Sequence, residues 1–136
     1  MQSFKKEERL RSKKLIDRLF EEGNDFFESP FKVIWLDISH ESNVPVQLLI
    51  SVSKRKIRKA VSRNLLKRRI REAYRKNKSG YFDFLKSQNR HCLIGIIYTY
   101  GRIAKYEQIE QKIILVLQRL QKELLKENVG PRSGNV

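Results

Sequence analysis

The apolar residues of the chain follow two patterns, one typical of helices and one typical of strands. Residues 15, 16, 19 and 20 form one apolar stripe, which predicts an amphipathic helix that Ser12 caps and Gly23 ends. Helical spacing also predicts a long helix over residues 57–76 and another over residues 104–127. Gly80 is expected to end the first of these, and the aromatic residues after it are expected to pack beneath a loop.

Three segments rich in β-branched and aromatic residues are typical of strands: residues 31–38, 46–52 and 91–99. A short polar loop joins the first two, so we expect them to pair antiparallel. The third is almost continuously apolar, which favours a central strand buried on both faces. A short strand at Phe26 and Phe27 completes the predicted order of elements, αβββαβα.

The 136 residues suffice for one domain with a modest core. We expect a flexible basic arm over residues 1–11, a single α/β domain over residues 12–127, and a disordered tail over residues 128–136. The apolar runs are far shorter than the roughly 20 residues that a membrane span needs. The basic start of the chain lacks the apolar stretch of a secretion signal, so we expect a cytoplasmic location.

The charge of the chain indicates the kind of partner. There are 30 Lys and Arg against 15 Asp and Glu, a formal net charge of +15, whereas ordinary soluble domains carry roughly 2–8. Thirteen of the 25 residues from Lys54 to Lys78 are Lys or Arg, and Glu72 is the one acidic residue among them. A folded segment with this much like charge favours a nucleic-acid backbone as partner, with an anionic membrane surface as the weaker alternative.

The sequence offers no group of residues suited to catalysis. Its acidic residues are scattered, whereas a metal-dependent nuclease clusters carboxylates around Mg²⁺. Neither His40 nor His91 has the neighbours that would make it the base of a nucleophile. The single cysteine, Cys92, lies in an apolar run and is predicted to be a buried thiol. We therefore predict no catalytic residue, no metal site and no cofactor bound by the protein alone.

The predicted helix over residues 57–76 has two unlike faces. Leu66, Ile70 and Ala73 lie on one side, at spacings of four and three, and are expected to contact the core. The other side is polar and basic, and each cation on it can neutralise a phosphate. Arg63 lies at the border of this side, which comprises Asn64, Lys67, Arg68, Arg71 and Arg75.

This region resembles the signature of a known family. Ser51-Val-Ser-Lys-Arg55 is followed by Ala60-Val61, then by Arg63-Asn-Leu-Leu-Lys-Arg68 and Arg71-Glu72. The order and spacing over about 22 positions resemble those of the bacterial ribonuclease P protein subunit. A helix ending in glycine before this region, and a strand and helix after it, extend the resemblance over nearly the whole chain.

The resemblance implies a fold and a division of labour. The fold is a two-layer α/β (α+β) sandwich with a four-stranded mixed sheet and a left-handed β-α-β crossover, although crossovers are in general right-handed. The protein is then a subunit of an endoribonuclease, binds the ribonuclease P RNA, and contacts the 5′ leader of precursor tRNA. That RNA removes the leader with Mg²⁺, which is expected to be bound mainly by the RNA. No protein partner is predicted.

By resemblance, two surfaces are expected to carry the function. A cleft between the first helix and the sheet takes the single-stranded leader, with Ile16, Phe20 and Ile34 as its lining and Arg63 and Asn64 at its edge. The surface that faces the catalytic RNA comprises Lys54, Arg55, Lys59, Lys67, Arg68 and Arg71.

The chain departs from the family pattern at three of these positions. Leu65 stands where the family has an arginine, and neighbouring Lys67 or Arg69 is expected to compensate for the lost phosphate contact. Ile16 and Ile34 stand where many members carry aromatic residues, so base stacking is expected to be weaker. Trp35 follows Ile34 and alternates to the opposite face, so we predict that it belongs to the core.

Two alternatives stay open on the residues alone. A structural rRNA-binding or ribosome-associated protein would share the charge and the fold but would need no leader cleft. A DNA-binding regulator would place the basic helix in a major groove. It would need a dimer interface and a turn before the recognition helix, and the sequence indicates neither.

Overall fold

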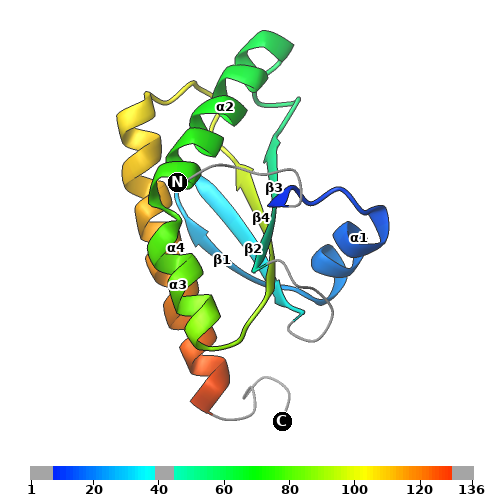
Figure 1. Ribbon diagram of the computed structural model, residues 1–136. Coiled ribbons are helices and arrows are strands. Elements are labelled where there is room, and N and C mark those ends of the chain that lie inside the picture. Colours follow the sequence, from blue (N-terminus) through cyan, green and yellow to red (C-terminus); the bar gives the residue numbers. More distant parts are fainter. Residues whose placement is uncertain (1–7, 39–44, 130–136) are drawn as a thin grey trace.

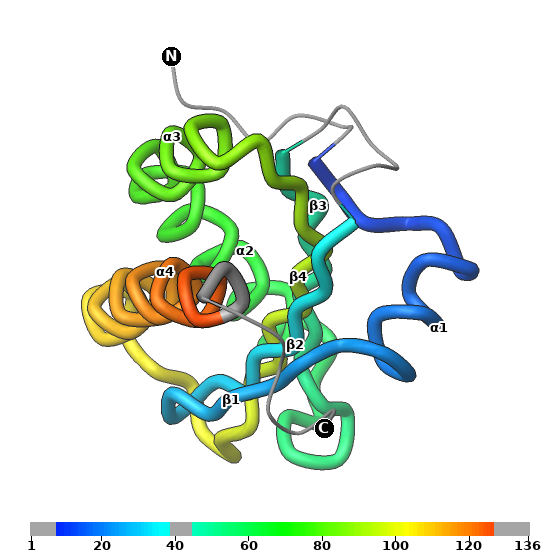
Figure 2. Tube along the Cα trace, turned by 90° about the horizontal axis from the view of Figure 1, so that it is seen from below, coloured from blue at the N-terminus to red at the C-terminus, as the bar shows by residue number. Residues whose placement is uncertain are grey.

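The computed structural model describes residues 8–38 and 45–129, which form one mixed sheet with helices on both faces (Figure 1). The elements are α1 (Lys13–Glu22), β1 (Asn24–Glu28), β2 (Phe31–Asp37), β3 (Val46–Val52), α2 (Ala60–Asn77), α3 (Ser79–Ser87), β4 (Cys92–Tyr98) and α4 (Tyr106–Val129). Figure 2 shows α2, α3 and α4 on one side of the sheet and α1 on the other. The predicted α+β sandwich with four strands is confirmed, and α1 adds a single helix on the opposite face.

The pairing of the strands differs from the prediction at one point. We expected β2 and β3 to pair, but the strand order is β1-β2-β4-β3, so β4 lies between them. It pairs antiparallel with β2 and parallel with β3. The physical reason is burial, because β4 is apolar along nearly its whole length and a central strand is covered on both faces. The predicted loop over residues 39–45, with His40, lies almost wholly outside the described residues.

The chain crosses from β3 through α2 and α3 to the parallel strand β4. Both strands point toward the end of the sheet where α2 begins, and α2 then runs back along the face opposite α1 (Figures 1 and 2). Seen from the side of α2 with the strands pointing up, β4 lies to the left of β3. The crossover is therefore left-handed, as the resemblance implies.

The main core lies between the sheet and the layer formed by α2, α3 and α4. Leu66, Ile70 and Ala73 are fully buried in it, so the predicted apolar side of the basic helix is confirmed. Trp35 belongs to the same core, and Cys92 is buried, both as predicted. This packing fixes which side of α2 turns away from the protein.

α1 packs on the opposite face of the sheet through Leu19, which is fully buried. Ser12 caps the helix, since its Oγ accepts a hydrogen bond from the Leu15 N–H at 3.3 Å, and Gly23 ends it, as predicted. A Cβ at Gly23 would lie 2.4 Å from the Leu19 carbonyl oxygen and 2.8 Å from Cγ2 of Ile34. Only glycine therefore lets the chain pass from α1 into β1 so close to the sheet.

The predicted loop after Gly80 is wrong, because residues 79–87 form α3. Lys78 joins α2 to α3 with a helical backbone (φ −79°, ψ −18°), so the chain changes direction without leaving helical geometry. Tyr81 and Leu85 are buried one helical turn apart. That spacing was the available signal for a helix.

The folded domain extends further at both ends than the predicted range of residues 12–127. Residues 1–7 and 130–136 lie outside the described part of the chain, but Asn128 and Val129 belong to α4 rather than to a tail. The prediction of a loose arm is wrong for residues 8–10. The Leu10 N–H donates to the Leu48 carbonyl at 2.9 Å, and the Leu10 side chain is buried. Glu8 forms a buried ion pair with Lys78 at 2.5 Å, which attaches this segment to the junction of α2 and α3.

Within the described residues, no helix combines the length and the apolar character that crossing a bilayer requires.

Two buried tyrosines predict how stability depends on pH. Burial raises the pKa of Tyr74 and of Tyr81 well above the ordinary value near 10. A raised folded-state pKa gives stability that is fully present below the unfolded pKa and is lost as pH rises above it. Each tyrosine is therefore expected to lower the free energy of unfolding by up to about 1.4 kcal/mol per pH unit above pH 10.

Chemical unfolding at pH 8 and pH 11 measures this effect. Tyr81→Phe is expected to reduce the alkaline loss of unfolding free energy by about 1.4 kcal/mol, and the double variant Tyr74→Phe/Tyr81→Phe by about twice as much. If wild type and both variants lost the same unfolding free energy between pH 8 and pH 11, ionisation of Tyr74 and Tyr81 would not be the cause of the loss.

Candidate nucleic-acid interface

A tight turn between β3 and α2 begins the basic segment. The Ser53 Oγ accepts hydrogen bonds from the backbone N–H groups of Arg55 (3.2 Å) and Lys56 (3.4 Å). Ile57 is 5% exposed and anchors the turn in the core, and its N–H donates to the Ser53 carbonyl at 3.0 Å. This turn delays the start of the helix from the predicted residue 57 to Ala60. It also directs the side chains of Lys54 and Arg55 into solvent.

Eleven of the 13 cations between Lys54 and Lys78 fall into two groups, whereas Arg58 lies exposed beside a hollow and Lys76 lies over the Tyr106 ring at 5.8 Å. Those of the first group reach no carboxylate and no other hydrogen-bond acceptor among the described residues. They lie on the turn before α2 and on its side away from the core. We call them the basic surface: Lys54, Arg55, Lys59, Lys67, Arg68 and Arg71.

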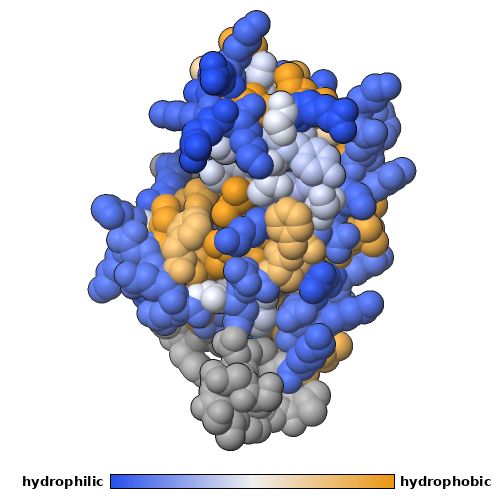
Figure 3. Space-filling view, turned by 180° about the vertical axis from the view of Figure 1, so that it is seen from behind, coloured by the Kyte–Doolittle hydropathy of each residue, from blue (hydrophilic) through white to orange (hydrophobic). Residues whose placement is uncertain are grey.

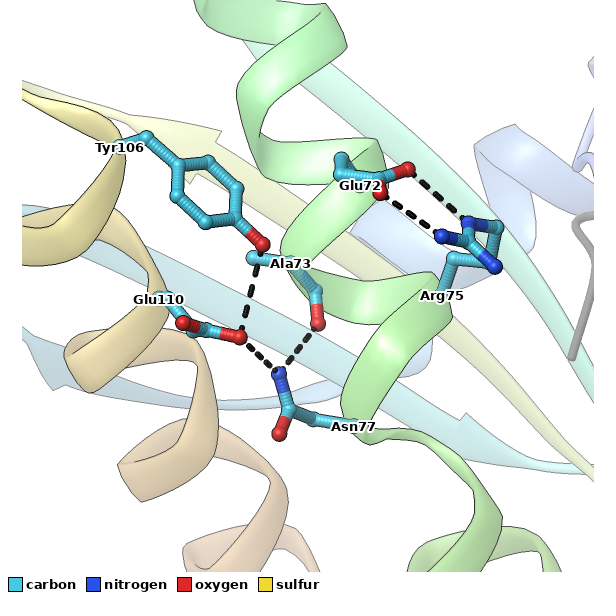
Figure 4. Close-up of polar contacts among 6 residues, drawn as sticks. All are labelled: Glu72, Ala73, Arg75, Asn77, Tyr106 and Glu110. Atoms are coloured by element: carbon cyan, nitrogen blue, oxygen red, sulfur yellow. Dashed lines mark hydrogen bonds and ion pairs between the residues drawn. The ribbon is translucent and has the colours of Figure 1, made fainter.

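Cations of the second group are bonded to carboxylates or carbonyl groups of the protein itself. Arg75, which we placed on the basic side of the helix, forms two hydrogen bonds with the Glu72 carboxylate at 2.9 and 2.7 Å (Figure 4). Lys56 donates to the Thr99 carbonyl (2.8 Å), and Arg69 donates to the Ala104 carbonyl (2.6 Å). Arg63 donates to the carbonyls of Ile57 (2.9 Å) and Arg58 (2.7 Å). Lys78 donates to the Glu8 carboxylate (2.5 Å).

This division changes two predictions about single residues. Arg69 is bonded to the Ala104 carbonyl, so it is poorly placed to compensate for Leu65, and Lys67 remains as the candidate. Arg63 closes the turn before α2 through two backbone carbonyls, so its removal would disturb the turn as well as any RNA contact. Asn64 is exposed beside it.

Arg71, which like Lys67 is partly buried, differs from the rest of the basic surface in the surroundings of its guanidinium group. Its Nε has no hydrogen-bond partner among the described residues. Burial, and then the neighbouring charge of Arg9, lower the pKa of the Arg71 guanidinium. Both effects disfavour the charged form of the guanidinium, and a bound anion would offset them. The position of Arg71 therefore favours an anionic ligand at this point of α2.

The C-terminal end of α2 is fixed to α4 by the polar contacts that Figure 4 shows. The Asn77 Nδ2 donates to the Ala73 carbonyl at 2.8 Å and to Oε2 of Glu110 at 3.0 Å. The Tyr106 hydroxyl donates to the same carboxylate oxygen at 3.4 Å. These contacts, with the apolar packing below, hold α2 rigidly while its outer side stays free to bind.

The three predicted lining residues of the leader cleft occupy different depths on the α1 side of the sheet. Phe20 is 50% exposed on α1, and Ile16 is partly buried. Ile34 is 6% exposed because α1 lies over it, so it supports the helix and offers almost no surface. Trp35 points to the opposite face. The apolar surface available to a ligand therefore belongs mainly to Phe20.

Strand register identifies further surface that the sequence analysis missed. Phe27 is opposite Lys32, and Lys32 is opposite Ile97, so all three lie on the α1 side of the sheet. Phe27 is 55% exposed and Ile97 is partly exposed. Alternation between Phe26, which is buried, and Phe27 was the available signal. Figure 3 shows apolar side chains at the surface inside a hydrophilic border, with hydrophilic groups gathered where α2 begins.

Arg58 was also missed. Its side chain is exposed on the turn before α2, and it lines a hollow of about 360 Å³ with Lys56 and Lys59. No group of three or more potential metal ligands of the His, Cys, Asp and Glu type occurs within residues 8–38 and 45–129.

Comparison with known proteins places this fold and surface in a class. The family model described as Ribonuclease P matches residues 4–121. The chain is 31% identical over 115 residues to the ribonuclease P protein component of Porphyromonas gingivalis, covering 85% of this chain and 84% of the relative. It is 33% identical over 129 residues to that of Chlorobium phaeobacteroides, covering 87% and 88%.

Solved structures of two RNase P proteins have a similar fold. The RNase P protein of Staphylococcus aureus aligns with a TM-score of 0.68 at 24% identity, covering 83% of this chain and 94% of that one. The RNase P protein of Thermotoga maritima aligns with a TM-score of 0.65 at 26% identity, covering 82% and 96%.

The fold thus defines a protein of the bacterial RNase P protein class. The chain belongs to the ribonuclease P protein family. As a protein component of ribonuclease P, it is a subunit of an endoribonuclease holoenzyme.

Proposed function

We propose that the chain binds the catalytic RNA of ribonuclease P through the basic surface and the 5′ leader of precursor tRNA through the α1 side of the sheet. It thereby assists removal of the leader, which yields the mature 5′ end of the tRNA. Mg²⁺ is bound mainly by the RNA, and the protein supplies no catalytic residue.

One observation carries this proposal. The six residues of the basic surface have no anionic partner within the described chain, while the neighbouring cations Arg75 and Lys78 are each paired with a carboxylate. A phosphate backbone provides regularly spaced anions for such a surface, and their binding releases counterions. The start of α2 adds to the attraction, because backbone N–H groups at a helix N-terminus favour anions.

The leader assignment rests on the exposed side of α1 and of the sheet. Phe20 and Phe27 present aromatic surface on which single-stranded bases can stack. Lys32 lies beside Phe27 on the same side, and its Nζ is 4.0 Å from the exposed Asp25 carboxylate. A leader phosphate can replace this weak surface ion pair. Asn64 on α2 is exposed and can donate to or accept from a base edge, a sugar or a phosphate.

Reconstitution tests the function. The purified protein is mixed with a transcribed bacterial ribonuclease P RNA and a precursor tRNA, at low Mg²⁺ where the RNA alone is slow. We expect 5′ cleavage in the mixture and none with the protein alone. Tight RNA binding without stimulation would indicate a structural RNA-binding protein instead, and cleavage by the protein alone would reveal an active site on the chain.

A further inference from the structure

A second concave surface lies on the α4 side of the molecule, away from the sheet face that carries α1. It is a hollow of about 550 Å³ between the β1–β2 turn, the loop over residues 99–105 and the first turns of α4. Its charged lining consists of the cations Arg102, Lys105 and Lys112, and no carboxylate of the described residues lines it. We call it the α4 pocket.

The side chains of Tyr98, Arg69 and Lys56 form four hydrogen bonds with the backbone of the loop that forms this pocket. The Tyr98 hydroxyl donates to the Arg102 carbonyl at 2.6 Å and accepts from the Ala104 N–H at 3.1 Å. Arg69 of α2 donates to the Ala104 carbonyl at 2.6 Å, and Lys56 donates to the Thr99 carbonyl at 2.8 Å. A surface fixed in this way loses little conformational entropy when a ligand binds.

Tyr100 presents an aromatic ring on the wall of the pocket. Its hydroxyl is hydrogen-bonded to the Ser29 Oγ at 2.9 Å, and its ring lies edge-to-face with Tyr98 at a centroid distance of 6.1 Å. The ring is thus held at two points while the side chain remains 41% exposed. Ile103, which is 43% exposed, adds apolar surface nearby.

The pocket is connected to the basic surface. The hollow of about 360 Å³ on the other flank of the same loop is lined by Lys56, Arg58 and Lys59, and it shares Arg102 and Ile103 with the α4 pocket. A strand of RNA bound at the start of α2 therefore meets cations continuously as it passes over the loop.

We propose that the α4 pocket binds a nucleotide of single-stranded RNA. The base stacks on Tyr100 and contacts Ile103, and the adjoining phosphates are bound by Arg102, Lys105 and Lys112. Fixed aromatic surface beside unpaired cations is the combination that single-stranded RNA requires, because every base has a π-face and every linkage carries a charge. The assignment rests on the proposed function, since it supplies that function with a third RNA contact surface.

Binding of a fluorescein-labelled octauridylate to the full-length protein tests the proposal. The double variant Lys105→Gln/Lys112→Gln is expected to bind about tenfold more weakly at 0.15 M salt, with a log–log salt slope smaller by about 1.4. Tyr100→Leu is expected to lose about tenfold, whereas Tyr100→Phe retains the ring and stays within about twofold of wild type. The control Lys86→Gln/Lys122→Gln removes the same charge elsewhere and is expected to bind like wild type.

A photocrosslink locates the bound strand. Octauridylate containing 4-thiouridine is expected to crosslink to the peptide that holds Tyr100, and crosslinks confined to peptides of α1 and α2 would overturn the proposal. An octaglutamate that displaces octauridylate as well as unlabelled octauridylate does would indicate a general anion site instead.

Failure of the pocket is distinguishable from failure of the proposed function. If the pocket variants bind octauridylate like wild type while substitution of the basic surface abolishes binding of ribonuclease P RNA, only the pocket assignment is wrong. If the wild-type protein binds neither RNA, the proposed function fails first.

Discussion

Replacing Lys67, Arg68 and Arg71 together by glutamine is expected to weaken binding of ribonuclease P RNA on the order of 100-fold at 0.15 M salt. Each cation that neutralises a phosphate contributes roughly 0.7–0.9 to the log–log salt slope, so the loss of three lowers the slope by about 2–3. The fold is expected to survive, because none of the three side chains has a partner among the described residues. Electrophoretic or filter-binding titration over a range of salt concentrations measures both quantities.

A matched variant separates this effect from net charge. Lys86→Gln/Lys122→Gln/Lys126→Gln removes the same three charges from α3 and the outer side of α4, where all three side chains are exposed. We expect it to change affinity less than about threefold, through long-range electrostatics alone. If both triple variants lose affinity equally, RNA is attracted by the overall charge and the basic surface has no special role.

Periodicity was sufficient for the elements in which local pattern and burial agree. Leu66, Ile70 and Ala73 marked the buried side of α2, and the continuous apolar run of β4 marked a strand covered on both faces. Pattern was insufficient where contacts between residues far apart in the sequence determine the structure. The pairing of β4 with both β2 and β3 depends on competition among strands for the centre of the sheet, which no local window contains.

The same limit applies to the interface. Composition showed that the segment from Lys54 to Lys78 is basic, but not which cations are available to a ligand. Arg69 and Lys56 are bonded to carbonyl groups of the loop after β4, more than 30 residues away in the sequence. Arg75, by contrast, is paired with Glu72 at a spacing of three, which the sequence could have shown.

Burial of Ile34 shows a related limit. Alternation correctly placed it on the face opposite Trp35, but the position of α1 on the sheet decides whether it is accessible. α1 approaches closely because Gly95 and Gly23 lack side chains, and a Cβ on Gly95 would lie 3.3 Å from Cδ2 of Leu19. Isoleucine at position 34 is therefore expected to affect packing under α1 more than contact with RNA.

Phe20→Ala is expected to reduce the preference of the holoenzyme for precursor over mature tRNA by about tenfold, because a base stacked on an aromatic ring contributes roughly 1–3 kcal/mol. Phe20 is half exposed, so its removal is expected to cost the fold little. With isoleucine at positions 16 and 34, Phe27 is the other exposed aromatic side chain described on this side, and it lies on β1 rather than on α1. Dissociation constants for a precursor with its leader and for leaderless mature tRNA measure the preference.

The neighbouring substitution Leu19→Ala is the structural control for this measurement. Leu19 is fully buried between α1 and the sheet, so we expect a loss of about 2–5 kcal/mol in unfolding free energy. That loss would weaken both tRNA forms together through a misplaced α1. A Phe20→Ala variant that weakened precursor and mature tRNA equally would behave like this control, and the leader would then have to bind elsewhere than along α1. A selective loss for the precursor requires contact between Phe20 and the leader, because the leader is the part that mature tRNA lacks.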